Sequence, residues 1–189
     1  VQAISEDKNG NLLIGTYNKG LFILSLKGKN ITNIIPELNY SRSYAVKTIL
    51  PSKNGMIWIG TRGGAYIFDE HYKIIDHLTH IENETNSLNH NSVVNIFEDN
   101  NGGIWLGTRN GISYFNQGVQ AFTYYGANLL NESSLNDPEI YSILESKNGN
   151  IWIGTESGGI NILDKKTGLF THLIHDENKE NSISLGPIK

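Results

Sequence analysis

The sequence predicts an all-β protein built from four tandem copies of one small antiparallel unit, and three observations predict it. A short phrase ending in Gly-Thr occurs four times in the 189 residues, and the Gly-Thr pairs start at residues 15, 60, 107 and 154. Apolar, β-branched runs of strand length alternate with turn residues, and no window of about ten residues shows helical periodicity. The chain has 20 glycines but only 4 prolines, which is typical of many tight turns between short strands.

The third copy shows the expected unit most clearly. Residues 99–102 end in Asn-Gly between two apolar runs, and this pair is a strong hairpin signal because both residues tolerate positive φ. Two further short turns follow, and a longer polar segment, residues 126–139, leads into the next copy. We expect four strands in this copy, at residues 93–98, 103–108, 112–116 and 120–125.

Four antiparallel strands followed by one long connection are typical of a β-propeller blade. Leucine-rich repeats have a shorter period, and helical repeats need a helical pattern that is absent here. The first copy diverges, since Leu13 replaces the Trp of the other copies and its connection, residues 37–44, lacks their Ser-Leu or Ser-Ile pair. We therefore predict a partial β-propeller over residues 1–189, with near-complete blades at about 1–44, 45–91, 92–138 and 139–189. Because the chain begins inside a repeat and without Met, we expect an excised piece of a longer protein.

The repeated phrase also carries a family resemblance. Residues 98–112 and 148–162 resemble the two-component regulator propeller repeat, and residues 170–183 are similar to the connection of the same family. The resemblance implies the periplasmic sensor region of a Bacteroides-type hybrid two-component histidine kinase in the inner membrane, with propellers of about seven blades. It further implies a non-catalytic segment that recognises an oligosaccharide and relays to a kinase outside this chain, with the remaining blades and sensor domains as partners.

Composition excludes several other classes. The net charge is −4, and its 15 basic and 19 acidic residues are scattered, so no basic stripe indicates nucleic-acid binding. The apolar runs are too short for a transmembrane helix, and we expect no direct membrane insertion. The chain has no cysteine, which both reducing and oxidising compartments allow.

The residues that recur once per copy are interpreted as scaffold. A tryptophan at the centre of the second strand could form a sugar-stacking platform, and the glycines could resemble a phosphate-binding loop. However, a core obeys the repeat symmetry whereas a ligand site breaks it, and a phosphate loop leads into a helix rather than a strand. We predict a structural repeat core formed by Trp58, Trp105, Trp152, Gly60, Gly107 and Gly154.

Metal, cofactor and catalytic sites are not predicted. His77 and His80, like His172 and His175, lie three residues apart on expected strands and therefore point to opposite faces. The Glu98–Asp99 pair could suggest calcium binding or a glycosidase, but an Asp that bonds its own turn is the plainer explanation. No Ser-His-Asp arrangement is evident.

The turns after each Gly-Thr pair differ from copy to copy, as expected for the part of a propeller that recognises a ligand. Tyr and Arg side chains can stack on a sugar, and Arg can pair with a carboxylate. We predict ligand-binding residues at Tyr17, Arg62, Arg109 and Glu156; solvated turn residues are the alternative. The alternative functions are a protein-interaction or structural propeller, or a propeller lyase or glycosidase. An open arc of blades would leave two apolar faces, so we also expect self-association through them.

Overall fold

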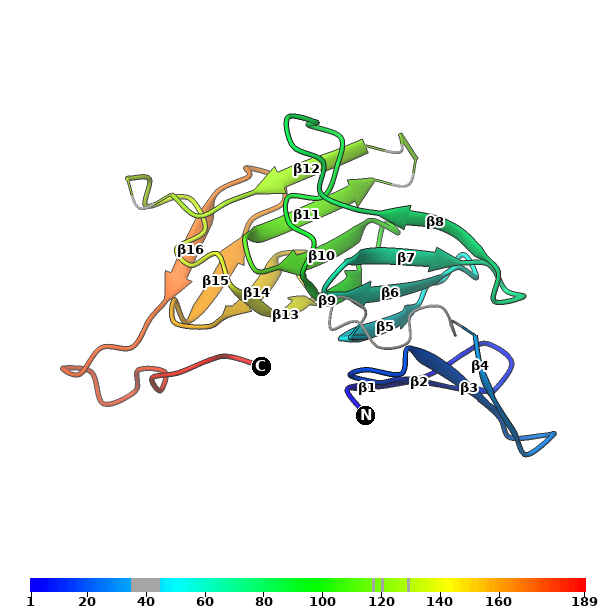
Figure 1. Cartoon of the computed structure of the whole chain (residues 1–189). Helices are drawn as coiled ribbons and strands as arrows, with labels where there is room; N and C mark the ends of the chain where they lie inside the picture. Colours follow the sequence, from blue (N-terminus) through cyan, green and yellow to red (C-terminus); the bar gives the residue numbers. More distant parts are fainter. Residues whose placement is uncertain (35–44, 117, 120, 129) are drawn as a thin grey trace. The chain divides into compact units, whose positions relative to one another are not determined.

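The computed structural model describes residues 1–34, 45–116, 118–119, 121–128 and 130–189. Within those residues the regular secondary structure is entirely β, with sixteen strands in four four-stranded sheets (Figure 1). The chain divides into two compact units, residues 1–96 and residues 97–189. The prediction of an all-β fold made of propeller blades is therefore confirmed.

Unit 1 contains two complete sheets whose strands are neighbours in chain order. The first sheet comprises β1 (Ala3–Glu6), β2 (Leu12–Gly15), β3 (Leu21–Ser25) and β4 (Asn30–Asn33). The second comprises β5 (Thr48–Pro51), β6 (Ile57–Thr61), β7 (Gly64–Phe68) and β8 (Ile74–Leu78). All neighbouring strands pair antiparallel. Each sheet therefore has a hairpin end, with its first and third turns, and a connection end, with its second turn and the segment that leaves its last strand.

The third and fourth sheets repeat this topology. One comprises β9 (Val93–Glu98), β10 (Ile104–Thr108), β11 (Gly111–Asn116) and β12 (Ala121–Tyr125), and the boundary between the units falls within β9. The other comprises β13 (Ile140–Glu145), β14 (Ile151–Thr155), β15 (Ile160–Leu163) and β16 (Phe170–Leu173), and it lies wholly in unit 2. The number and order of strands per copy are those expected from the sequence.

The strand boundaries differ from the prediction by one residue at two positions. β9 has the predicted bounds, whereas β10 begins at Ile104 rather than Gly103. β11 begins at Gly111, because Gly111 pairs with Thr108 and closes the turn tightly. The divergent connection over residues 37–44, and Gln120 at the predicted start of the fourth strand, lie outside the described residues.

Each unit has a hydrophobic core that draws on two consecutive sheets. In unit 1 the buried cluster is Leu13, Leu21, Ile23, Val46, Ile57, Ile59, Tyr66 and Phe68. In unit 2 it is Trp105, Ile112, Leu135, Ile140, Ile143, Ile151, Ile153, Leu163 and Phe170. Burying one such Leu or Ile side chain contributes about 1.5–3 kcal/mol. Because no sheet here has a core of its own, stacking on a neighbour is what stabilises each blade.

The glycine of each Gly-Thr pair lies where the next segment of the chain packs closest. A Cβ atom on Gly107 would lie 2.6 Å from Cγ2 of Ile140, the first residue of β13. The equivalent atom on Gly15 would lie 2.3 Å from Val46 Cγ1, and that on Gly60 2.9 Å from Val93 Cγ1. Glycine recurs because only its missing side chain allows a β-branched residue this close.

The first hairpin of the third sheet shows why its turn residues specify a turn. Oδ1 of Asp99 accepts hydrogen bonds from the backbone N–H groups of Asn101 and Gly103, each at 2.9 Å. Gly102 has a φ of 80°, which favours glycine. Asp7 accepts equivalent bonds in the first sheet. The acidic residue thus bonds its own turn, as the sequence analysis suggested.

Candidate ligand-binding surface

The four predicted ligand-binding residues lie at the connection ends of the sheets, where each follows a Gly-Thr pair. Two of them belong to unit 1 and two to unit 2. In each unit they are joined by residues next to or within the start of a first strand, and in unit 2 also by Lys189, which lies after the last described strand. We call these groups the unit 1 rim cluster (Gln2, Tyr17, Lys47, Arg62) and the unit 2 rim cluster (Arg109, Glu139, Tyr141, Glu156, Lys189).

The unit 1 rim cluster is built around the ring of Tyr17. The side chain of Tyr17 is 38% exposed. Arg62 Cζ lies 5.5 Å from the ring centroid and Lys47 Nζ lies 5.7 Å from it, so both cations are within the range of a cation–π interaction. Lys47 Nζ also donates to Oε1 of Gln2 at 3.1 Å. The structure therefore brings Tyr17 and Arg62 together, with the ring partly open to solvent.

The unit 2 rim cluster combines both charges around Tyr141. Arg109 Nε lies 3.3 Å from Oε1 of Glu139, and Lys189 Nζ lies 5.5 Å from the centroid of the Tyr141 ring. The Tyr141 hydroxyl hydrogen-bonds Glu156, and this bond raises the pKa of Tyr141 above its ordinary value of 10.0, with a smaller contribution from burial. Arg109 and Glu156 thus both influence the pKa of the same residue, Tyr141.

One oxygen of this cluster has an unused hydrogen-bonding capacity. Oε2 of Glu156 is buried and has no hydrogen-bond partner among the described residues. A buried acceptor without a partner costs about 1–3 kcal/mol, so a bound hydroxyl or N–H group that donates to this oxygen would recover that energy. This is the most specific sign of a ligand contact in the rim clusters.

The cluster residues that lie outside the turns after Gly-Thr were not predicted from the sequence. Gln2, Lys47 and Tyr141 occupy equivalent positions at or next to the start of the first strand in the first, second and fourth copies, and Val94 takes that position in the third copy. Aligning the copies would have identified this position, because it varies from blade to blade as the predicted turn residues do. It was overlooked because the search for unequal residues was confined to the turns after Gly-Thr.

The long connections contain a repeated loop held by serine and histidine. Ser134 Oγ donates to the carbonyl oxygens of Asn128 at 2.9 Å and Asn131 at 2.8 Å, and Ser87 and Ser182 make similar bonds. His80 Nδ1 lies 2.7 Å from Leu88 O, and His175 Nδ1 lies 2.7 Å from Ile183 O. The Ser-Leu signature and the second histidine of each pair therefore stabilise loop geometry.

The first histidine of each pair also bonds backbone. His77 Nε2 lies 2.9 Å from Gly63 O, whereas His172 Nε2 lies 2.8 Å from Ser134 O. Among the residues that the structure describes, no three His, Cys, Asp or Glu side chains are placed to hold a metal ion. The four histidines have hydrogen-bonding roles here that need no metal.

The predicted repeat core is buried in two copies and more open in the fourth. Trp58 and Trp105 are each 2% exposed, whereas Trp152 is only half-buried. Gly60, Gly107 and Gly154 all lie in the central strands and are buried. Trp152 is more exposed because it lies on the face of the fourth sheet that no other described sheet covers.

A charged network at the hairpin end of unit 2 was not predicted. Trp105 Nε1 donates to Oδ2 of Asp99 at 3.0 Å. Lys165 Nζ contacts the same oxygen at 3.0 Å and Oε1 of Glu145 at 2.8 Å. The side chains of Asp99 and Glu145 are 1% and 4% exposed. Lys165 and Glu145 come from the fourth sheet and Asp99 from the third, so the network joins the two sheets.

This network predicts a stability loss in acid. Burial works to raise the pKa of Asp99, but hydrogen bonds from Trp105 and Lys165 outweigh it and hold the pKa below its ordinary value of 3.8. A carboxylate with a lowered pKa contributes stability that is complete above its unfolded pKa and is lost as pH falls through its folded pKa. We expect the free energy of unfolding, measured in urea, to decline below about pH 4, with a slope approaching 1.4 kcal/mol per pH unit from this group.

The matched variant for this measurement is Asp99→Asn. Its unfolding free energy should be lower at neutral pH and should depend less steeply on pH below about 4. Asp7 and Asp137 also have lowered pKa values, where hydrogen bonds outweigh burial, so part of the acid dependence should remain. Identical pH slopes for the two proteins would contradict the assignment to Asp99.

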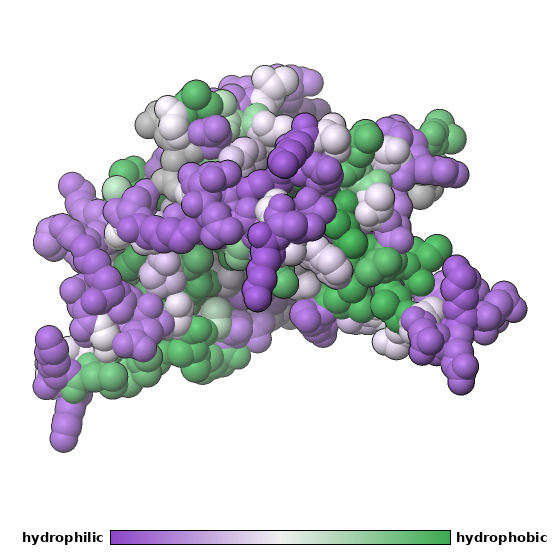
Figure 2. Space-filling model, turned by 180° about the vertical axis from the view of Figure 1, so that it is seen from behind, coloured by the Kyte–Doolittle hydropathy of each residue, from purple (hydrophilic) through white to green (hydrophobic). Residues whose placement is uncertain are grey.

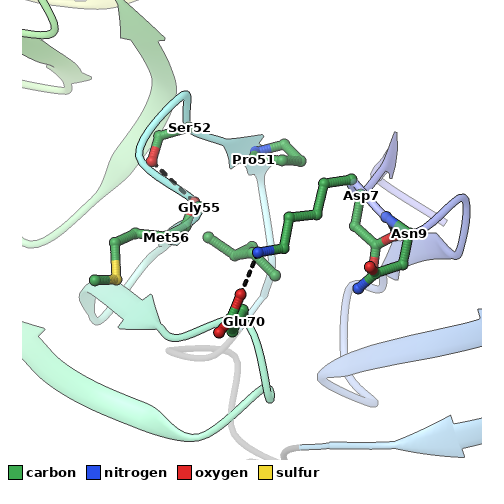
Figure 3. A pocket seen from close by; sticks show the side chains of 9 residues that line it. Asp7, Asn9, Pro51, Ser52, Gly55, Met56 and Glu70 are labelled. Atoms are coloured by element: carbon green, nitrogen blue, oxygen red, sulfur yellow. Dashed lines mark hydrogen bonds and ion pairs between the residues drawn. The ribbon is translucent and has the colours of Figure 1, made fainter.

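A small cavity at the hairpin end of unit 1 is a poor ligand site. It lies between the first hairpins of the two sheets, lined by residues such as Asp7, Ser52 and Met56 (Figure 3). Lys8 and Glu70, which both line the cavity, form an ion pair (Figure 3). Its volume of about 20 Å³ suits a single water molecule rather than a sugar. The rim clusters, at the opposite end of the sheets, remain the better candidates.

The described part of the chain contains no helix of the length and apolarity needed to cross a membrane.

The four sheets, each with its strands in chain order, define the chain as a segment of β-propeller blades. Residues 1–18, 87–110 and 134–157 match the profile of the family described as two component regulator propeller. These three segments are therefore similar to two-component regulator propeller repeats, and the resemblance seen in the sequence is confirmed. A comparison with curated protein sequences gives no match.

Solved structures with the same fold include sensor and non-sensor proteins. The extracellular domain assigned to a hybrid two-component system of B. thetaiotaomicron is 26% identical, with a TM-score of 0.71 over 99% of this chain and 23% of that one. Virginiamycin B lyase from Staphylococcus aureus is 15% identical, with a TM-score of 0.67 over 94% of this chain and 56% of the lyase. PorZ, a surface component of the type-IX secretion system of Porphyromonas gingivalis, is 19% identical, with a TM-score of 0.67 over 95% and 28%. The last two show the fold alone, and this chain spans under a quarter of the sensor domain.

Proposed function

We propose that the chain is a non-catalytic, extracytoplasmic ligand-sensing segment of a hybrid two-component sensor kinase. The repeat type and the similarity to an extracellular domain of such a system support this class. The proposed ligand is an oligosaccharide, and the proposed location is the periplasmic side of an inner-membrane receptor. Ligand binding would favour one receptor arrangement and so bias a kinase that lies outside this chain.

The ligand proposal rests on one observation: the residues at the rim positions differ from copy to copy, whereas the scaffold residues recur. The Trp and Gly positions of the second strand recur from copy to copy, with Leu13 the exception among the tryptophans. The rim positions instead hold Tyr17, Arg62, Arg109 and Glu156. An aromatic ring flanked by cations can stack on a sugar, and the free acceptor of Glu156 can bind a hydroxyl. Since the recurring Gly and Trp positions supply the packing, the rim positions are free to vary for recognition.

The test is calorimetric titration of the chain with a panel of neutral and uronic-acid-containing oligosaccharides. For any sugar that binds, Tyr17→Ala or Glu156→Ala is expected to weaken affinity about tenfold to a hundredfold, a loss of 1.4–2.8 kcal/mol. The matched control, Lys166→Ala, changes an exposed residue at the hairpin end and should leave affinity unchanged.

Two results would overturn the proposal. If no member of a broad panel gives a heat of binding, the ligand is not an oligosaccharide and a protein-binding propeller is favoured. Binding that persists in both rim variants would place the site elsewhere. For the relay, the same sugar should change autophosphorylation of the full-length receptor, and the rim variants should shift that response to higher sugar concentration by the same factor as their affinity.

A further inference from the structure

The unit 1 rim cluster places two positive charges beside one aromatic ring. Arg62 Cζ and Lys47 Nζ lie 5.5 Å and 5.7 Å from the centroid of the Tyr17 ring. In the part of the chain that the structure describes, no Asp or Glu side chain forms an ion pair with Arg62. The arginine therefore brings a positive charge to the ring that no described carboxylate compensates.

The equivalent arginine of unit 2 is compensated within its own cluster. Arg109 follows a Gly-Thr pair as Arg62 does, and its Nε lies 3.3 Å from Oε1 of Glu139. Glu139 is the residue immediately before β13, and the residue in the same place before β9 is Ser92. Ser92 is buried and uncharged. Unit 1 thus has the arginine without the carboxylate that accompanies it in unit 2.

The two cations of this cluster differ in burial from an ordinary surface charge. Figure 2 shows many hydrophilic side chains on the face that it displays, so a charge at the surface is by itself no sign of a site. Arg62 and Lys47 are both half-buried, whereas Lys27, in the turn after β3, is exposed. Charges that are partly removed from water are screened less by salt and attract a bound anion more strongly.

The contacts shown for the two cations attract them without cancelling their charge. The face of the Tyr17 ring is negative only through its quadrupole. Lys47 Nζ donates to Oε1 of Gln2 at 3.1 Å, and an amide oxygen has no net charge. A ligand that brings a negative charge to this ring is attracted by both cations. The guanidinium of Arg62 offers paired N–H groups for an oxyanion, and the ammonium of Lys47 adds a point charge.

This attraction is local and does not follow from the charge of the whole chain. The net charge is −4, which does not favour anions at long range. The unit 2 rim cluster includes the carboxylates of Glu139 and Glu156, and the buried Oε2 of Glu156 is an acceptor that calls for a donor. Selectivity for an anionic group is therefore a property of the unit 1 rim cluster.

We propose that the unit 1 rim cluster binds an acidic oligosaccharide, whose carboxylate or sulfate group pairs with Arg62 while Lys47 attracts the same charge. Tyr17 is a positioning residue here, because its ring holds the two cations. The inference rests on the proposed function, since it names the class of sugar that this site takes. A uronic acid and a sulfate ester supply the same chemistry, and the experiment distinguishes them.

The experiment is calorimetric titration of the full chain with two sets of matched sugars. One set pairs uronic-acid oligosaccharides with the same sugars after reduction of their carboxyl groups to alcohols, and the other pairs sulfated oligosaccharides with their desulfated forms. In one set, the charged member should bind at least about tenfold more tightly than its neutral form. Raising the salt concentration from about 0.05 to about 0.5 M should weaken binding of the charged member alone.

Four variants and a matched control assign the effect to named side chains. Arg62→Gln and Lys47→Gln should each weaken binding of the acidic sugar about tenfold and reduce its salt dependence. Lys27→Gln removes the same charge from an exposed turn of unit 1 and should bind as the wild type does. Tyr17→Phe keeps the ring and should retain the affinity, whereas Tyr17→Leu should lose it, as expected of a positioning residue. Circular dichroism checks that each variant remains folded.

The possible failures separate this inference from the proposed function. If the neutral forms bind as tightly as the charged forms in both sets, recognition of an anion is wrong while oligosaccharide sensing stands. The same holds if an acidic sugar binds equally well to the wild type and to both the Arg62→Gln and Lys47→Gln variants, because the anionic group then binds elsewhere. If no sugar of either set or of the broader panel binds, the oligosaccharide itself is excluded, and the inference fails together with the proposed function.

Discussion

Lys165→Met is expected to lower the free energy of unfolding by about 3 kcal/mol, because removing one partner of a buried ion pair leaves uncompensated charge. Lys165 is the cation that Asp99 and Glu145 share, at 3.0 and 2.8 Å. Both carboxylates are nearly inaccessible, whereas the Lys165 side chain is 21% exposed. Water can partly replace the ammonium group, so we place the loss at the lower end of the range of about 3–5 kcal/mol for breaking such pairs.

Urea unfolding of three proteins tests this expectation. Lys166→Met is the matched control, because it removes the same charge from an exposed neighbour and should change stability by less than about 0.5 kcal/mol. The triple variant with Asp99→Asn and Glu145→Gln removes the stranded charges and should recover part of the loss. Equal stability of the Lys165 and Lys166 variants would show that the network contributes nothing.

Gly107→Ala is expected to destabilise the chain by about 1–3 kcal/mol through overpacking of a close contact. The new Cβ atom would lie 2.6 Å from Cγ2 and 3.2 Å from Cβ of Ile140. Both residues are buried in strands, so the sheets must move apart or the side chain must leave its preferred rotamer. The cost therefore arises at the packing of β10 against β13.

A double-mutant cycle separates this clash from a general effect of the substitution. Ile140→Ala alone should cost about 2–5 kcal/mol, but it removes the methyl group that meets the new Cβ atom. The double variant should therefore be more stable than additivity predicts by at least about 1 kcal/mol. Gly28→Ala, at an exposed turn where the nearest atom would be 3.4 Å away, is the control and should be close to neutral. Strictly additive stability changes would mean that there is no steric clash between a Cβ atom at position 107 and Ile140.

The fold could be predicted from the sequence because one local pattern is repeated four times. Each copy contains its own turn chemistry, such as Asp99 and Gly102, and its own alternation of apolar residues. These signals act within one hairpin, and the strand order then follows from short connections. β9 has the predicted bounds, and the remaining differences are single residues at turns.

The candidate site could be predicted only in part. Tyr17, Arg62, Arg109 and Glu156 were predicted because the turns after Gly-Thr differ from copy to copy, and in the structure they lie in two clusters. Their neighbours Lys47 and Tyr141, at equivalent positions near the start of first strands, were missed because the prediction considered only the turns after Gly-Thr. The Lys165 network was missed because Asp99 and Lys165 are far apart in sequence.

The sequence by itself determined the repeat, the strands, the turns and the type of blade, because these depend on residues within one copy. Only the tertiary structure decided which tryptophan is covered, which carboxylate shares a lysine and which acceptor of Glu156 is left without a partner. Those properties depend on what the neighbouring sheet places against each residue. Trp105 and Trp152 have nearly the same local sequence, yet Trp105 is buried and Trp152 is half-buried, because the fourth sheet covers Trp105 and no described sheet covers Trp152.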